Sequence, residues 1–399
     1  MNADERAHLV AMSALPYIGP ARLRRLAELG DPSAQWSALI ARRVDRDLQL
    51  RPEESAAIST AAASFDVVEH VDRHARAGIG IDVLGEPDYP EVLAADHEAP
   101  VVLFSRGAPL GAVSPSVGIV GTRTASGYGC SFAFELGAAL IDEGITVISG
   151  LALGIDAAAH SGAVSRLVEG ADGTAPVTAG DAARAGSVIG VVGCGLDRTY
   201  PQRNRVLHHA VIDNGSLIAE VPIGTVPARW RFPARNRMIA ALSDVLVVVE
   251  SGAAGGSMIT VDEATTRSRT VLAVPGPVTS DSSAGTNQLI ADGCGPCRHV
   301  GDVLTALQLS PIGPWRNDRS DLDHAAELER SADVARRAQL SPAAQDVLSE
   351  LDWVPTTLDR LASGTGRGFG EVCEALDQLI GAGLARERGG RYERMAGPR

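Results

Sequence analysis

The sequence predicts an α/β protein built on a doubly wound parallel sheet, with a helical region before it and a winged helix after it. Two observations predict this class. From about residue 115, short and almost continuously apolar segments alternate with longer helical ones, as in parallel sheets covered by helices on both faces. The chain has 399 residues, 45% of them hydrophobic, which is enough for one large domain and one or two small ones.

The first 75 residues predict a helical domain. The stretch LPYIGPARLRRLAELG indicates a helix, a Gly/Pro hairpin at residues 18–20 and a second helix with leucines at helical spacing. This is the shape of a helix-hairpin-helix, whose hairpin amides contact phosphates, and an ordinary helical corner explains it equally well. We therefore predict a SAM-like or helix-hairpin-helix-like domain over residues 1–75.

Residues 76–310 predict a Rossmann-like core. Two short strand-like pieces, GIDVLG and PVVLF, come before the alternating region. The six predicted strands are VGIVGT, ITVISG, SVIGVVG, SLIAEV, DVLVVVE and TVLAVPG. The helices between them include GCSFAFELGAALIDEG, IDAAAHSGAVSRL and RNRMIAALS. In such sheets ligands bind at the carboxyl ends of the strands, so the site is expected there. The low-complexity stretch 168–186 is expected to be a mobile surface insertion.

The C-terminal part predicts a linker followed by a winged helix. Residues 311–339 are charged and interrupted by proline, which is typical of a linker. Residues 340–399 contain three helical patterns and a Gly-Gly hairpin between two short charged strands. The third pattern, FGEVCEALDQLIGAGL, carries Glu371, Glu374 and Asp377 and no arginine, which is unsuited to insertion into a DNA major groove.

Composition and charge exclude several classes of protein. The formal net charge is −13, which argues against indiscriminate coating of nucleic acid but leaves room for a local basic site. The sequence has no lysine, so all 36 basic residues are arginines and neither a Walker A lysine nor a Schiff-base lysine exists. Five cysteines, no signal peptide and no apolar run of about 20 residues lead us to expect a cytoplasmic protein.

Three predicted strand ends carry residues suited to binding phosphate. GIVGTRTASGYG places Arg123 just after a glycine turn, and glycines open the next helix, whose N-terminus favours an anion. The pattern is not G-x-G-x-x-G, so NAD binding is disfavoured, and no cofactor is expected. GCGLDRTYPQRNR follows its own glycine turn with Tyr200 among arginines. ESGAAGGSMIT provides a third glycine-rich turn with Ser257 at a helix start.

The strand end SGLALGIDAAAH leaves two interpretations open. Asp156 and His160 are four residues apart and share a helical face, which is how a hydrolase arranges a base and its orienting group. Alternatively, Asp156 binds backbone amides at the helix start and His160 packs locally. We expect structural roles for both, next to the site.

The stretch ARWRFPARNRMIAAL carries four arginines within nine positions and two aromatic residues, Trp230 and Phe232. Arginines supply contacts to phosphates, and aromatic rings supply stacking surfaces for unpaired bases, so this composition predicts single-stranded nucleic acid as the ligand. Arg235 and Arg237 are two apart and cannot share one helical face. One is expected to bind DNA and the other to brace the fold, or a carboxylate such as Glu220.

The tetrapeptide Cys294-Gly295-Pro296-Cys297 matches a thioredoxin-type redox motif. Such a motif follows an early strand and begins a long helix, whereas this one comes late in the predicted sheet. With His299 the pair also suggests zinc, but a fourth ligand at the usual spacing is missing. Neither a redox centre nor a metal site is therefore expected.

Taken together, these stretches resemble the DNA-processing protein A (DprA/Smf) family. GIVGTRTASGYG, SGLALGIDAAAH, GCGLDRTYPQRN, FPARNRMIAALSDVLVVVE, GGSMIT, VPGPV and GTNQLIADG occur in the family's order over residues 115–300. The resemblance implies a Rossmann-like core that binds single-stranded DNA, forms a dimer, and helps to load a RecA-type recombinase during natural transformation or recombination. It implies no catalytic turnover.

The resemblance and the glycine turns together define the predicted DNA-binding set. Its members are Gly121, Thr122, Arg123, Ser149, Gly150, Gly154, Gly195, Tyr200, Arg203, Asn204, Arg205, Phe232, Arg235, Asn236, Arg237, Gly256 and Ser257. The chain departs from the family at Gln202, where many relatives have a basic residue, and Arg203 and Arg205 flank that position.

One enzyme remains as an alternative. Nucleotide phosphoribohydrolases that resemble lysine-decarboxylase-like proteins share the Rossmann-like fold and carry the signature P-G-G-x-G-T-x-x-E. GAAGGSMITVDEA echoes it loosely through Gly255, Gly256 and Glu263, but the initial Pro-Gly is absent.

Overall fold

The computed structural model describes residues 1–110, 115–171, 186–309, 340–351, 356–382 and 384–394. The predicted linker at 311–339 and most of the predicted insertion at 168–186 lie outside the described residues. Within the described part, no helix is both long and apolar enough to cross a membrane.

The N-terminal region is a group of five helices. They are α1 (Ala3–Met12), α2 (Pro20–Glu28), α3 (Pro32–Ile40), α4 (Pro52–Ala63) and α5 (Val67–Arg76). Local sequence sets the helix starts: Asn2 and Glu5 form a capping box on α1, and proline is the first residue of α2, α3 and α4. The Gly/Pro hairpin predicted at 18–20 lies between α1 and α2.

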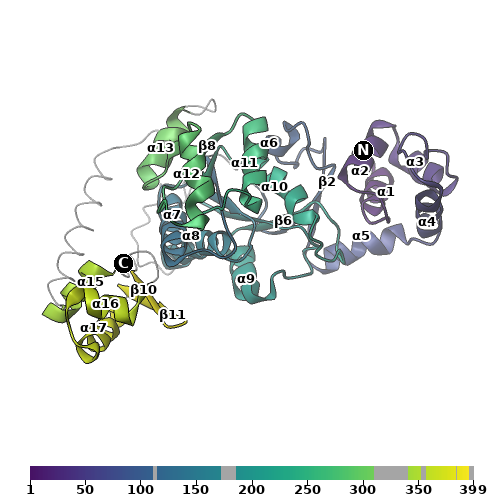
Figure 1. Ribbon diagram of the computed structural model, residues 1–399. Helices are drawn as coiled ribbons and strands as arrows, with labels where there is room; N and C mark the ends of the chain where they lie inside the picture. The colour runs from purple at the N-terminus through teal and green to yellow at the C-terminus, as the bar shows by residue number, and fades with distance from the viewer. Residues whose placement is uncertain (111–114, 172–185, 310–339, 352–355, 383, 395–399) are drawn as a thin grey trace.

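The core is a nine-stranded, mostly parallel sheet, which confirms the predicted fold class (Figure 1). The strands are β1 (Gly80–Val83), β2 (Val102–Gly107), β3 (Ser116–Val120), β4 (Thr146–Ser149), β5 (Val188–Val191), β6 (Ser216–Ala219), β7 (Val245–Val248), β8 (Thr270–Ala273) and β9 (Gly295–Pro296). Their order is β1-β2-β6-β5-β4-β3-β7-β8-β9. The six strands predicted from the apolar segments are β3 to β8, and they pair with one another in parallel. At one edge of the sheet, β2 pairs antiparallel with both β1 and β6.

Helices cover both faces of the sheet because its strands bury alternate side chains on opposite sides. Val245 and Val247 join one apolar cluster, while Leu246 and Val248 join the other. The first cluster includes residues of α7 (Gly127–Asp142), α8 (Ile155–Ala171), α9 (Arg205–Asn214) and α13 (Val300–Leu309). The second includes residues of α6 (Glu91–Ala94), α10 (Arg231–Leu242), α11 (Gly256–Thr266) and α12 (Ala284–Ala291).

The helices α7 and α8 pack backbone to backbone. A Cβ atom added at Gly162 would lie 1.9 Å from the carbonyl oxygen of Phe134, and one at Gly137 would lie 2.2 Å from that of Ala159. These contacts require glycine at both crossing points. They fix the two helices that begin at the carboxyl ends of β3 and β4.

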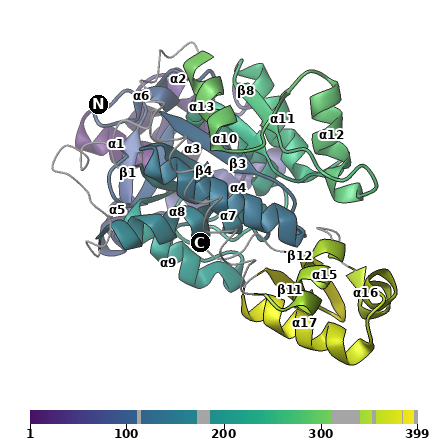
Figure 2. The same cartoon turned by 90° about the vertical axis from the view of Figure 1, so that its left-hand side faces the viewer.

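The C-terminal residues form a separate small unit with its own apolar core. Its elements are α15 (Pro342–Glu350), β10 (Thr356–Thr357), α16 (Leu358–Thr365), α17 (Phe369–Gly381), β11 (Ala385–Arg388) and β12 (Arg391–Arg394). The strand order is β10-β12-β11, and the Gly389-Gly390 turn joins the last two strands. Figure 2 shows this unit beside α7. The division of the chain into domains stays a prediction.

Candidate nucleic-acid interface

An exposed aromatic group lies at the carboxyl edge of the sheet. Tyr200, from the loop after β5, stacks on Phe232 at the start of α10, with ring centroids 5.2 Å apart and an interplanar angle of 23°. The guanidinium carbon of Arg123, from the loop after β3, lies 5.1 Å from the centroid of the Phe232 ring. Tyr200 is 40% exposed, and Arg123 is also exposed. We call Arg123, Tyr200 and Phe232 the aromatic platform.

Backbone contacts hold the loops that carry the platform. The Thr122 N–H donates to the Glu250 carbonyl at 2.7 Å, and the Thr122 carbonyl accepts from the Ile155 N–H at 3.2 Å. Gly154 has φ +77°, and a Cβ atom there would lie 2.3 Å from the Thr122 carbonyl oxygen. A Cβ atom on Gly121 would lie 2.6 Å from Ile155. Glycine at both positions therefore lets the loops after β3 and β4 pack directly on each other.

Three polar residues of the predicted set brace these loops from inside. The buried Asn204 donates through Nδ2 to the carbonyls of Leu151 and Ala152, at 2.9 and 3.1 Å. The fully buried Ser149 donates to the Ile119 carbonyl at 2.6 Å, and the buried Ser257 donates to Ser251 Oγ at 2.8 Å. Each of these side chains thus donates a hydrogen bond to a neighbouring strand or loop of the protein itself.

Arg235 lies buried behind the strand ends. Its side chain is 8% exposed, its Nη2 donates to the Gly150 carbonyl at 3.0 Å, and it lies 3.8 Å from Asp156 Oδ2. Its Nε and Nη1 atoms make no hydrogen bond within the described residues. Burial lowers the pKa of Arg235 and raises that of Asp156, and their mutual attraction opposes both shifts. A Cβ atom at Gly150 would lie 1.6 Å from Arg235 Nη1, so a side chain there would displace the guanidinium from this position.

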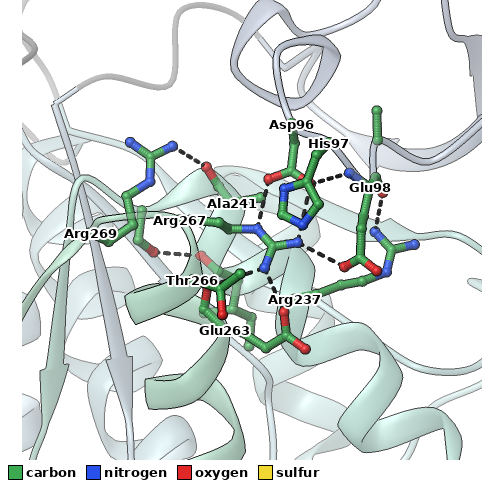
Figure 3. Close-up of polar contacts among 12 residues, drawn as sticks. Asp96, His97, Glu98, Arg237, Ala241, Glu263, Thr266, Arg267 and Arg269 are labelled. Atoms are coloured by element: carbon green, nitrogen blue, oxygen red, sulfur yellow. Dashed lines mark hydrogen bonds and ion pairs between the residues drawn. The ribbon is translucent and has the colours of Figure 1, made fainter.

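Arg237 points to a different set of partners (Figure 3). Its Nη1 donates to the Glu98 carbonyl at 2.6 Å, and its Nη2 pairs with Glu220. Both side chains of this ion pair are buried; burial raises the pKa of Glu220, and Arg237 counteracts the shift. Of the two arginines, Arg237 is thus the one that pairs with Glu220.

The neighbouring Arg267 closes a denser ion cluster, also shown in Figure 3. It pairs with Asp96 at 2.7 Å, with Glu98 at 2.9 Å and with Glu263 at 2.5 Å. This cluster fastens the segment before β2 to α11. It also engages the carboxylate of Glu263, the residue that the phosphoribohydrolase alternative needs for chemistry.

Asp156 and His160 form no dyad within the described residues. His160 is fully buried, its Nε2 lies 3.2 Å from the Ile189 carbonyl, and burial lowers its pKa to about 3. Asp156 instead lies beside Arg235 and accepts from the Ala152 N–H at 3.4 Å. The two side chains thus contact different partners, Asp156 the Arg235 side chain and His160 the Ile189 carbonyl.

The remaining members of the predicted set differ in exposure. Arg203, in the 3₁₀ turn Gln202–Asn204, and Arg205, the first residue of α9, are exposed. Asn236 is half-buried on α10, and Gly256 is exposed at the start of α11. Gly195 is buried, where its N–H donates to the Thr225 carbonyl at 3.0 Å.

The predicted set omitted a pair next to the platform, formed by the exposed Trp230 and the half-buried Arg231. Trp230 is 59% exposed, and the guanidinium carbon of Arg231 lies 4.4 Å from its ring centroid. The alternation of arginine and aromatic residues in ARWRF was the available signal. Sequence alone did not indicate which arginine covers which ring, because the chain turns into α10 within this segment.

The cysteine pair lacks the features of a redox centre. Cys294 is half-buried, Cys297 is fully buried, and both are free thiols. Burial raises the pKa of both, that of Cys297 to about 12, whereas a reactive thiol needs a lowered pKa. Within the described part of the chain, no three His, Cys, Asp or Glu residues are grouped to hold a metal ion.

The fold and the site together define a Rossmann-like α/β protein with arginine and aromatic side chains gathered at the carboxyl edge of its sheet. The chain belongs to the DNA recombination-mediator protein A family, whose sequence profile matches residues 81–308. The resemblance inferred from its motifs is thereby confirmed.

Named relatives agree with this membership. Protein Smf of Synechocystis is 28% identical over 431 residues, which cover 99% of this chain and all of the relative. The putative DNA processing protein DprA of Mycobacterium tuberculosis is 34% identical over 300 residues, or 74% of this chain and 68% of the relative. The X-ray structure of DNA processing protein A from Streptococcus pneumoniae matches with a TM-score of 0.60 and 27% identity, over 76% of this chain and 98% of that one.

Proposed function

We propose that the protein binds single-stranded DNA across the carboxyl edge of its sheet and helps to load a RecA-type recombinase onto it. The aromatic platform is the observation that carries this proposal. Its stacked rings are open to solvent at one end, and a guanidinium lies over the Phe232 ring. An unpaired base stacks on such a ring, which contributes about 1–3 kcal/mol per base, while arginine binds the phosphate.

The same geometry favours single strands over duplex DNA. In a duplex, the bases are stacked on each other and their faces are closed to protein side chains. Phosphate contacts alone would bind both forms, so the selectivity comes from the Tyr200 and Phe232 rings. Neither ring reads hydrogen-bonding groups on a base edge, and binding should therefore depend little on sequence.

Family membership supports the finer parts of the proposal. The relatives carry the names DNA processing protein and DNA recombination-mediator protein. We infer from them that the protein works in recombination or natural transformation, in the cytoplasm, as a homodimer and without catalytic turnover.

A titration with matched oligonucleotides tests the proposal. A 30-nucleotide strand and its blunt duplex are titrated at one salt concentration, followed by fluorescence anisotropy. We expect clearly tighter binding of the single strand and little change between unrelated sequences. Equal affinity for both forms would contradict the proposal.

A second assay addresses the enzyme alternative and the partner. Release of free base from nucleoside monophosphates would support the phosphoribohydrolase instead. Recombinase loading is measured as the rate at which a RecA-type recombinase forms filaments on strands coated with single-strand-binding protein. We expect the protein to raise this rate and a Tyr200→Ala/Phe232→Ala variant to lose the effect.

A further inference from the structure

The hairpin formed by β11 and β12 packs against the first residue of α7. A Cβ atom added to Gly127 would lie 2.4 Å from Glu393 Oε1 and 3.0 Å from Arg386 Nη2. Arg386 and Glu393 are paired across the hairpin at 2.6 Å. Figures 1 and 2 both show the C-terminal unit beside α7. The ends of the Arg386 and Glu393 side chains therefore lie directly against Gly127, in space that a side chain at position 127 would contest.

The docked carboxylate is incompletely satisfied. The Glu393 side chain is 5% exposed, and its Oε1 accepts from Arg386. Its Oε2 is buried and makes no hydrogen bond within the described residues. A buried charged oxygen without a partner costs free energy, so this contact is held less firmly than a fully bonded one.

The position of this carboxylate matters because α7 begins at the proposed DNA edge. Arg123 is four residues before Gly127, and the loop between them carries the platform arginine. The N-terminus of α7, capped by Ser126 Oγ on the Gly129 N–H, favours negative charge, and one carboxylate already lies there: Glu250 accepts from the Ser126 N–H at 2.9 Å and from Ser126 Oγ at 2.6 Å. A carboxylate and a DNA phosphate are both anions, and they suit the same end of a helix.

We propose that the C-terminal hairpin is an autoinhibitory contact: Glu393 holds it on the N-terminus of α7, where it excludes the DNA backbone, and DNA binding displaces it. This inference rests on the proposed function. The hairpin is a suitable competitor because its carboxylate carries the charge of a phosphate but leaves one oxygen unbonded. A DNA strand brings several phosphates and bases to the carboxyl edge of the sheet. It therefore forms more contacts there than are lost when the hairpin leaves.

The test uses the full chain with substitutions on both sides of the contact. Glu393→Ala removes the docked carboxylate. Glu374→Ala, on the exposed face of α17, changes the net charge equally and serves as the control. Gly127→Ala removes the docking space from the other side and is compatible with a helical position. Affinity for an oligo(dT) strand is measured for each variant.

We expect Glu393→Ala and Gly127→Ala each to tighten binding about fivefold, and Glu374→Ala to match the wild type. The combined Glu393→Ala/Gly127→Ala variant should bind no more tightly than the tighter single variant, because both remove one contact. In hydrogen exchange, oligo(dT) should raise the exchange of the hairpin amides in the wild type.

The outcomes separate the two proposals. Suppose that the wild type binds the strand but Glu393→Ala binds it no more tightly than Glu374→Ala, or that the affinity gains of Glu393→Ala and Gly127→Ala add fully in the combined variant. Either result would show that the hairpin does not compete with DNA, and the proposed function would stand. If the wild type binds no single strand, the proposed function is wrong and the competition with it. If Gly127→Ala alone weakens binding while hairpin exchange stays unchanged, Gly127 serves the DNA directly and the inference is overturned.

Discussion

Arg235 and Arg237 are neighbours on α10 with opposite surroundings. Arg235 reaches the strand ends, where its Nη2 bonds the Gly150 carbonyl, while its Nε and Nη1 make no hydrogen bond to any residue that the structure describes. Arg237 reaches Glu220 and the Glu98 carbonyl on another side of the helix. A helix turns about 100° per residue, so two positions apart point in nearly opposite directions. The first turns of α10 thereby place one arginine at the proposed site and another in an ion pair that holds the fold together.

At the residue scale, Arg123→Ala should weaken binding of single-stranded DNA without unfolding the protein. Arg123 is exposed and its guanidinium lies over the Phe232 ring, so its removal loses little packing. Removal of one phosphate contact should reduce the slope of log affinity against log salt by about 0.7. The slope is measured by titration at several salt concentrations, with Arg76→Ala as an exposed control. Lost affinity with an unchanged slope would show that Arg123 acts through the platform's structure alone.

Arg237→Ala should act on stability. It leaves the buried carboxylate of Glu220 without its cation, and removal of one partner of a buried pair costs about 3–5 kcal/mol. Urea denaturation followed by circular dichroism measures the loss. Arg237→Ala together with Glu220→Ala should recover part of it. A stable Arg237→Ala protein with a reduced salt slope would instead place Arg237 on the DNA surface.

At the residue scale, the sequence predicted which residues gather near the site better than it predicted which contacts their side chains make. The arginine and aromatic pattern pointed to Arg123, Tyr200 and Phe232, which lie together in the structure. It also included Ser149 and Asn204, whose side chains face inward. Whether a polar side chain at a strand end faces solvent depends on how neighbouring loops pack, and no local pattern records that.

At the scale of elements, the strands were the easiest to predict. Strands β3 to β7 are buried on both faces and are therefore mostly apolar. The order in which they pair is not a local property, and neither are the glycine contacts between α7 and α8. The capped helix starts at Asn2 and at the prolines are local, and sequence can place them.

The segment around β9 carries a prediction about the cysteines. A Cys294→Ser/Cys297→Ser variant should keep its affinity for single-stranded DNA within about threefold. Burial raises the pKa of both thiols, so neither is poised to react. Accordingly, the native protein should react slowly with a thiol reagent at these positions at pH 8. A large loss of affinity, or one zinc atom recovered per chain, would contradict this view.

At the scale of the whole molecule, four histidines are buried in a neutral state. Burial lowers the pKa of His70, His74, His160 and His208, to about 4 for His70 and His208 and about 3 for His160. The unfolded chain binds these protons near pH 6.5, whereas the folded chain binds them only at lower pH. Stability from this source is present above pH 6.5 and is lost as the pH falls below it.

We therefore expect the free energy of unfolding to decrease between pH 7.5 and pH 5. Each fully shifted histidine accounts for up to roughly 2 kcal/mol at pH 5. Thermal unfolding in buffers of equal ionic strength measures the effect. His160→Gln should reduce the pH dependence, since glutamine does not titrate. An unfolding midpoint that is the same at both pH values would show that these side chains are accessible to protons in the folded state.

The Arg267 cluster has a consequence for synthesis of the chain. Asp96 and Arg267 are separated by 171 residues, so the ribosome must add that length before the clamp forms. At about 5–20 residues per second, the interval is roughly 10–30 s. Strand β2 waits similarly for β6, its partner in the sheet. During translation the first hundred residues thus carry an unpaired strand edge, and chaperone occupancy on the nascent chain should be highest in that window.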